Sequence, residues 1–375
     1  MNLGELLPEL IKGLSNFTLG NGLMIAVSLG LIYLAIAKEI EPVLLLPIGF
    51  GCMLANIPLS GMTAAEGMMG ALYGGIKTEI FPLLIFVGVG AMIDFSPLLA
   101  QPRMALLGAA GQFGIFGTLI LAIALGFPLN QAASIGVIGA IDGPTSIYVA
   151  SKLSPELLAP IAVAAYSYMS LIPIIQPPLM KLLTTKKERM IRMDYAPKPV
   201  SHTALVLFPV LITVVVGLLV PDATPLISML MLGNLLKVSG VVDRLSKAAQ
   251  NEIINIATLF LGLTIGATMS AASFLNFDTG KVLLLGLIAF GLDTIVGLLF
   301  GKLMSFLSGG KINPLIGAAG ISAFPMAGRI SAKMALDEDP DNFILMHAMG
   351  SNTAGQLGSV IAGGVLLAIV SKLVL

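Results

Sequence analysis

Tryptophan is absent from this sequence, cysteine occurs once, and charged residues are scarce. The single Cys52 excludes an intramolecular disulfide framework and a metal site built from several cysteines. Tryptophan often marks membrane–water interfaces, so its absence removes the usual aromatic belt as a guide to them. The 20 lysines and arginines balance the 20 aspartates and glutamates, which gives no electrostatic reason to expect a nucleic-acid partner.

Apolar residues take the place of the missing charge. Hydrophobic residues make up 57% of the chain and charged residues 11%, whereas about a quarter of a soluble domain is charged. A soluble protein of this composition would expose large apolar patches, but apolar stretches of about 17–25 residues match a bilayer. The sequence therefore predicts an all-α, polytopic membrane protein. The apolar segments lie at about 20–37, 43–58, 80–95, 104–126, 131–150, 157–182, 203–220, 224–238, 253–275, 281–305, 312–332 and 342–373.

Four regions follow each other along the chain. Residues 1–19 combine three charged residues with leucines, which predicts an amphipathic surface segment rather than a cleavable signal. Residues 20–182 and 201–375 form two membrane regions. Between them, residues 183–200 form the most basic connection in the chain. The positive-inside rule places this linker in the cytoplasm.

The two membrane regions match each other in the order of their segments and partly in sequence. Residues 135–152 and 316–333 share an Ile-Gly pair, a second glycine, a proline and a lysine in register. Corresponding Gly/Pro-interrupted segments in two repeats indicate a transporter-type site near the bilayer midplane. If the repeats are inverted, each half must cross the membrane an odd number of times. Other matching positions pair Gly90 with Gly266 and, after one skipped residue, Gly51 with Gly233.

The first interrupted segment contains Asp142, in Gly-Ala-Ile-Asp-Gly-Pro-Thr-Ser. Glycine tolerates unusual backbone angles and proline lacks an N–H, so we expect the helix to open and expose carbonyl oxygens. A carboxylate near a membrane centre costs about 2.5–3.5 kcal/mol, which calls for a function. With the hydroxyls of Thr145 and Ser146 it outlines a cation site. The alternative is an interfacial aspartate that caps a helix in a simple turn.

The second interrupted segment contains Asn313, Gly317, Ser322 and Arg329. An amide oxygen, a hydroxyl and approachable backbone carbonyls are oxygen ligands suited to a hard cation such as Na⁺. Arg329 could bind an anionic substrate through its planar guanidinium. The alternative for Arg329 is an interfacial side chain that extends to the lipid headgroups.

Small polar groups recur within two further apolar segments. Tyr168 lies in Ala-Ala-Tyr-Ser-Tyr-Met-Ser, and Asn352 lies in Met-His-Ala-Met-Gly-Ser-Asn-Thr-Ala-Gly. Both are candidates for the site, although such groups also serve only to hold transmembrane helices together. Asp293 is another carboxylate in an apolar run, and either serves a second cation or a proton path or bonds a neighbour such as Thr294.

These motifs resemble those of the β subunit of sodium-pumping, biotin-dependent decarboxylases, a group that includes oxaloacetate, methylmalonyl-CoA, glutaconyl-CoA and malonate decarboxylases. The resemblance covers residues 22–375. It implies that the family's essential aspartate corresponds to Asp142 and its functional tyrosine to Tyr168. The family's Asn, Gly, Ser and Arg set corresponds to Asn313, Gly317, Ser322 and Arg329.

The resemblance also implies a mechanism and partners. A carboxyltransferase subunit would move CO₂ onto biotin on a carrier, and this subunit would decarboxylate the carboxybiotin and export Na⁺ while a proton is consumed. Na⁺ would bind at Asp142, Ser322 and the backbone near Gly317, with Asn313 in support. Asn352 is a further predicted Na⁺ ligand.

Further roles and partners follow from the same resemblance. Tyr168 would serve a second Na⁺ or the proton path, and Arg329 would meet carboxybiotin from the cytoplasmic side. The expected setting is a homo-oligomeric complex, with a small membrane-anchored subunit, in a bacterial or archaeal cytoplasmic (inner) membrane.

Two other functions fit the same residues. A Na⁺/H⁺ antiporter or Na⁺–carboxylate symporter would use the same broken repeats and oxygen ligands. A membrane scaffold without activity would not need Asp142 as a carboxylate. The residues leave open which acid is decarboxylated and how many Na⁺ ions move.

Overall fold

The computed structural model of the protein describes residues 11–193 and 199–374 as a chain of helices, with no strand within those ranges. Seven helical stretches in this part are long and apolar enough to cross a membrane, or eight if the bent pair α5 and α6 counts as one. The prediction of an all-helical, multi-pass membrane protein is confirmed. The seven are Leu19–Ala37, Met104–Ala124, Pro155–Leu183, His202–Leu219, Asp243–Ala267, Phe277–Leu307 and Leu345–Val374.

The first half of the chain begins with a short helix and ends in the basic linker. Residues 1–10 of the predicted amphipathic segment lie outside the described residues, as do 194–198 of the linker. A capping box between Thr18 and Asn21 starts α3. The helices are α2 (Lys12–Ser15), α3 (Leu19–Ala37), α4 (Pro42–Ala55), α5 (Met68–Lys77), α6 (Ile80–Met92), α7 (Ser96–Ala100), α8 (Met104–Ala110), α9 (Phe113–Ala124), α10 (Leu129–Gly136), η1 (Val137–Ala140), α11 (Gly143–Leu153), η2 (Pro155–Leu157), α12 (Leu158–Leu183) and α13 (Lys186–Arg189).

The second half repeats much of this order of elements. A π-helical turn, η4, lies between α16 and α17, and the region 312–332 holds less regular helix than its apolar sequence predicts. The helices are α14 (His202–Leu219), η3 (Pro221–Ala223), α15 (Thr224–Val238), α16 (Asp243–Ala248), η4 (Ala249–Ile253), α17 (Ile254–Ala267), α18 (Ala271–Phe274), α19 (Phe277–Leu307), α20 (Leu315–Ala318), α21 (Met326–Glu338) and α22 (Leu345–Val374).

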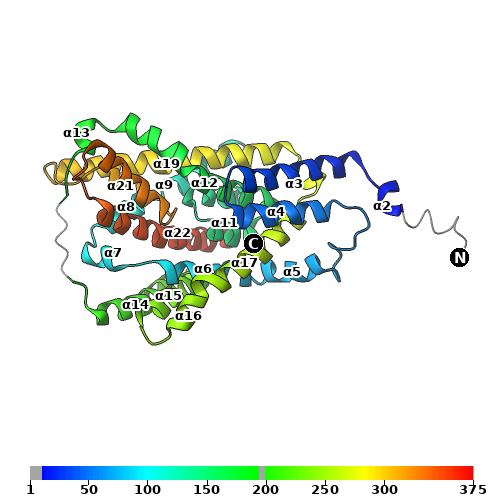
Figure 1. The fold of residues 1–375 in the computed structure, drawn as a ribbon, viewed down its shortest axis with the longest axis horizontal. Coiled ribbons are helices and arrows are strands. Elements are labelled where there is room, and N and C mark those ends of the chain that lie inside the picture. Colours follow the sequence, from blue (N-terminus) through cyan, green and yellow to red (C-terminus); the bar gives the residue numbers. More distant parts are fainter. Residues whose placement is uncertain (1–10, 194–198, 375) are drawn as a thin grey trace, which may run out of the picture.

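Two helix crossings, among other contacts, connect the halves. Helix α4 packs on α17 and α15 packs on α6, while α3 covers α4 and α14 covers α15. Figure 1 shows the α3–α4 pair toward the end at which α2 lies and the α14–α15 pair toward the opposite end. Long helices α12 and α19 pack together, and α22 packs against α8 and α11.

At both crossings, glycines allow the two helix backbones to approach closely. Each helix contributes one glycine, and each glycine faces the backbone of the other helix. A Cβ atom at Gly51 would lie 2.2 Å from the carbonyl oxygen of Leu263, and one at Gly266 would lie 2.1 Å from that of Ile48. At the other crossing, a Cβ at Gly233 or Gly90 would lie 1.9 Å from a carbonyl oxygen of the facing helix. In each case the contact oxygen belongs to the residue three positions before the partner glycine.

These contacts make the crossing glycines sensitive to one added methyl group. We expect Gly90→Ala and Gly266→Ala to destabilise the protein by about 1–3 kcal/mol each, because the backbones must separate. Thermal unfolding in detergent would measure this as a lowered midpoint. The control is Gly291→Ala in α19, where a Cβ meets nothing within 4 Å. A Gly90→Ala protein as stable as that control would contradict the account.

Candidate functional site

Asp142 lies where the helical structure of the first half is interrupted. Helix α10 tightens into η1, which ends at Ala140, and α11 begins at Gly143 with Pro144 in its first turn. Ile141 between them has φ 53°, a left-handed conformation that a β-branched residue rarely adopts. Such strained residues concentrate at functional sites. The Ser146 hydroxyl donates to the carbonyl of Val137 at 3.2 Å and to that of Asp142 at 3.0 Å.

The Asp142 carboxylate is buried and held by three donors. Its Oδ2 accepts hydrogen bonds from Thr145 Oγ1 at 2.6 Å, Gln356 Nε2 at 2.8 Å and Ser359 Oγ at 3.0 Å. Asp142 is 5% exposed. Two of the three donors come from α22 in the second half of the chain, so the carboxylate ties the two halves together. A buried charge without such donors would be far more costly.

The second interruption faces the first. Regular helix is absent between Ala318, the last residue of α20, and Met326, the first of α21. Ser322 Oγ donates to the carbonyl of Gly355 at 2.8 Å, and Asn352 Nδ2 donates to the carbonyl of Ile321 at 2.7 Å. Asn352 Oδ1 is buried and has no hydrogen-bond partner. Helix α22 thus contacts both interruptions, because Asn352, Gln356 and Ser359 follow one face of it.

A cavity of about 190 Å³ joins the two interruptions. Its lining residues come from α4, α6, α12, α17, α22 and both interrupted segments, and they include Glu41, Asp142, Tyr166, Thr258, Ser322 and Gln356. A carboxylate, hydroxyls and amide oxygens around a space of this size can bind a small cation with oxygen ligands. The cavity is therefore the candidate site.

The structure brings some of the predicted residues together here. Asp142 and Ser322 line the same cavity, and Asn352 bonds the residue just before Ser322. Tyr168 does not line it: its hydroxyl donates to the carbonyl of Leu283 on α19. Arg329 lies exposed on α21, and no hydrogen bond or ion pair to its guanidinium is found in the described chain.

Asn313, just before α20, and Gly317, within it, do not line the cavity. Asn313 Nδ2 donates to the carbonyls of Arg189 and Ile191 at 2.9 Å each, and its Oδ1 accepts from the backbone of Leu315. All three contacts hold the basic linker and the start of α20. A Cβ at Gly317 would lie 2.0 Å from the carbonyl oxygen of a facing glycine in α19, so Gly317 permits a close helix contact. As Na⁺ ligands, both residues stay predictions.

Ion pairs reinforce the contact between the linker and the end of α21. Arg189 Nη2 lies 2.6 Å from Glu338 Oε1, and Arg192 Nε lies 2.6 Å from Asp339 Oδ2. The hydrogen bond from Arg192 lowers the pKa of the Asp339 carboxyl, so this pair persists at neutral pH. The linker therefore contacts the element that leads out of the second interruption.

Several residues of the site were not selected from the sequence. Tyr166, rather than Tyr168, lines the cavity, and a Cβ at Gly143 would collide with its ring. Gln356 and Ser359 follow Asn352 at the spacing of one helix face, a signal that was available in the sequence. Glu41 had no such signal, because it lies at the end of an apolar segment far from Asp142 in the chain.

Asp293 is a residue of α19. It lies apart from the cavity and contacts the first turn of α9. Its Oδ1 accepts from the backbone N–H of Gly114, and its Oδ2 is buried without a hydrogen-bond partner. It does not line the cavity that contains Asp142.

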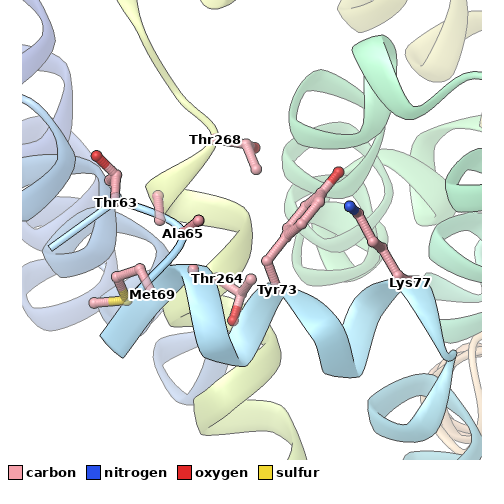
Figure 2. Close-up of a pocket in the computed structure, with 9 residues that line it drawn as sticks. Thr63, Ala65, Met69, Tyr73, Lys77, Thr264 and Thr268 are labelled. Atoms are coloured by element: carbon pink, nitrogen blue, oxygen red, sulfur yellow. The ribbon is translucent and has the colours of Figure 1, made fainter. Parts of the chain in front are cut away.

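A second, more open groove of about 350 Å³ lies between α5 and the end of α17. Figure 2 shows Tyr73 and Lys77 projecting from α5 on the side of Thr268. Lys77 Nζ lies 5.3 Å from the centre of the Tyr73 ring. A lysine in place of a carboxylate makes this groove a poor site for Na⁺.

Interrupted helices around a buried carboxylate, together with seven membrane-capable helical stretches in the described part of the chain, are typical of ion-coupled membrane transport proteins. Residues 20–370 match the family model described as the Na⁺-transporting oxaloacetate decarboxylase beta subunit. The chain belongs to this family, and the resemblance inferred from its motifs is confirmed. The predicted function, membrane β subunit of a Na⁺-transporting, biotin-dependent decarboxylase that acts with partner subunits, is confirmed at the level of the family.

Relatives match the chain over nearly its whole length. The methylmalonyl-CoA decarboxylase subunit beta of Veillonella parvula is 56% identical, with 96% of each chain covered. The glutaconyl-CoA decarboxylase subunit beta of Acidaminococcus fermentans is 55% identical, again with 96% of each covered. The oxaloacetate decarboxylase beta chain of Klebsiella pneumoniae is 49% identical, with 97% of this chain and 98% of the relative covered.

The contacts of Asn313 predict an anchoring role that can be separated from ion binding. A hydrogen bond contributes about 1 kcal/mol, so loss of the two bonds to the linker in Asn313→Ala weakens its anchoring by about 2 kcal/mol. Trypsin cleavage at Lys186, Lys187 and Arg189 should then be about thirtyfold faster. Limited proteolysis of the purified complex measures this. Asn16→Ala, at an exposed asparagine outside the linker, is the control. Unchanged proteolysis with a raised Na⁺ requirement would instead make Asn313 a Na⁺ ligand.

Proposed function

We propose that this chain decarboxylates carboxybiotin presented by a partner subunit and uses the reaction to move Na⁺ out of the cell. The reaction takes up one proton: the N–CO₂ bond of carboxybiotin breaks, CO₂ leaves, and the biotin nitrogen gains a hydrogen. The carboxylate at two facing helix interruptions is the observation on which this proposal rests. Na⁺ is the transported substrate, and carboxybiotin is the substrate of the chemical step.

Three oxygens of residues that line the cavity, and one of Asn352 beside it, are available for Na⁺. All the side-chain hydrogen bonds to Asp142 fall on Oδ2, which leaves Oδ1 for a cation. Ser322 Oγ uses its hydrogen toward Gly355, so its lone pairs are free. Gln356 binds Asp142 through its nitrogen and keeps its amide oxygen. The unpartnered Asn352 Oδ1 is the fourth. Hard cations prefer such ligands.

Asp142 would couple the ion to the proton. A single buried carboxylate is neutralised either by a proton or by Na⁺, but not by both at once. Na⁺ that binds the protonated site therefore releases a proton, and the biotin nitrogen consumes one. Decarboxylation would in this way draw Na⁺ onto Asp142. Competition between Na⁺ and H⁺ for the Asp142 carboxylate is enough to couple Na⁺ transport to proton consumption.

Arg329 and Tyr168 would act outside this cavity. Arg329 lies exposed on α21 with Lys333 one turn later on the same face, which suits the anionic carboxybiotin. The basic linker is held to the end of α21, which supports a cytoplasmic position for this region under the positive-inside rule. Tyr168 remains a proposed ligand of a second Na⁺ or part of the proton path, and must then leave the carbonyl of Leu283.

The repeat and the assembly belong to the same proposal. The reciprocal glycine contacts of α4 with α17 and of α15 with α6 support two repeats related by a pseudo-two-fold axis. Movement of the interrupted segments past these crossings would give alternating access. The partners are a carboxyltransferase with its biotin carrier and a small membrane-anchored subunit, in a homo-oligomeric complex of the cytoplasmic (inner) membrane. The choice of acid would belong to the carboxyltransferase.

Replacement of the carboxylate tests the proposal. In the reconstituted complex supplied with free carboxybiotin, Asp142→Asn should reduce Na⁺-stimulated decarboxylation by at least about a hundredfold, because loss of transition-state or ion contacts worth about 2.7 kcal/mol has that effect. The control is Asp278→Asn, an exposed carboxylate on α19 that pairs only with Lys281. Full Na⁺-stimulated activity in Asp142→Asn would refute the proposal. Na⁺ movement that needs no carboxybiotin would favour an antiporter.

A further inference from the structure

The cavity has a second carboxylate in its lining, Glu41, which belongs to neither interrupted segment. Glu41 lies at the elbow between α3 and α4 and lines the cavity together with Asp142 and Ser322. It is half-buried, and among the described residues no lysine, arginine or histidine pairs with it. The proposed Na⁺ site does not use Glu41, although an uncompensated charge beside an apolar core is costly.

The backbone holds Glu41 toward the cavity. Glu39 and Glu41 both have positive φ, 53° and 36°, so the chain reverses sharply before Pro42 starts α4. Glu41 occupies the N-cap position, yet its side chain makes no capping hydrogen bond. The residue instead lines the cavity.

Helix α17 supplies oxygen ligands next to Glu41. A Cβ at Gly262 would lie 3.2 Å from the carbonyl of Leu44, which fixes how α17 lies on α4. One turn earlier on α17 is Thr258, and one turn earlier on α4 is Glu41, and both line the cavity. Thr258 Oγ1 donates to the carbonyl of Ile254 at 2.7 Å, so its lone pairs are free to accept.

Asn255 completes this wall. It lines the cavity less than a turn from Thr258, directly after the π-helical turn η4. π-helical turns occur often at functional sites, where they redirect side chains. A carboxylate, a hydroxyl and an amide oxygen thus face a cavity that already contains the proposed Na⁺ ligand Asp142.

We propose that Glu41, Thr258 and Asn255 form an outer cation site. It is a weaker Na⁺ site that the ion occupies on its way to or from Asp142. This inference rests on the proposed function and extends it. Glu41 belongs to the α4–α17 crossing, whereas Asp142 belongs to the interrupted helices. The two carboxylates therefore lie on different packing units, and relative movement of these units would pass the ion from one to the other. Tyr166 lines the same cavity as both carboxylates.

The test is the Na⁺ dependence of carboxybiotin decarboxylation by the whole complex in proteoliposomes. Glu41→Gln keeps the shape and removes the charge, so we expect the Na⁺ concentration for half-maximal rate to rise about tenfold, equivalent to about 1.4 kcal/mol. High Na⁺ should recover the lost rate. Glu41→Asp should recover part of the affinity. Glu39→Gln, at an exposed carboxylate of the same elbow, is the matched control and should behave as wild type.

Two results would overturn the proposal of an outer cation site. One is a half-maximal Na⁺ concentration in Glu41→Gln equal to that of wild type, and the other is loss of activity at every Na⁺ concentration in a folded complex. If Glu41→Gln fails to assemble, Thr258→Val gives the same information. A rise of about threefold in the Na⁺ concentration for half-maximal rate supports the outer cation site, and an unchanged value refutes it. Asp142→Asn run in parallel separates the two ideas, because its full activity would refute the proposed function itself.

Discussion

The packing of the two halves at the candidate site depends on how one buried carboxylate, that of Asp142, is stabilised in apolar surroundings. Asp142 follows a strained left-handed residue, and three side-chain donors converge on one of its oxygens. Two of these donors lie on α22, so the interruption in the first half is stable only when the second half is packed against it. A buried carboxylate satisfied on one oxygen and open on the other is suited to exchange a proton for a cation.

Close packing elsewhere gives the site a rigid frame. Four glycines bring α4 onto α17 and α15 onto α6 at backbone contact distance, which leaves these crossings little freedom to slide. The segments around Asp142 and Ser322 have less regular helix. Movement is therefore expected in the interrupted segments, and the frame resists it. A rigid frame beside less regular segments, the proposed Na⁺ site among them, is the arrangement that the proposed alternating access requires.

The sequence predicted the helices, the importance of the two interruptions and the family, because apolar length and Gly/Pro motifs are local signals. It also placed Asp142 and Ser322 in one site, since their segments match in the two halves. It could not distinguish Tyr166 from Tyr168, because the choice depends on how α12 is rotated. Asn313 looks like a ligand in the sequence, but its amide holds a linker that is distant in the chain. Glu41 reaches the site only through the packing of α4 on α17.

The most direct test of the central claim is the release of protons when Na⁺ binds. The complex in weakly buffered detergent solution, without carboxybiotin, would be titrated with NaCl against a choline chloride control while a pH indicator is followed. The account predicts proton release that saturates with Na⁺ binding and disappears in Asp142→Asn. Na⁺ binding without proton release, or release that is unchanged in Asp142→Asn, would contradict it.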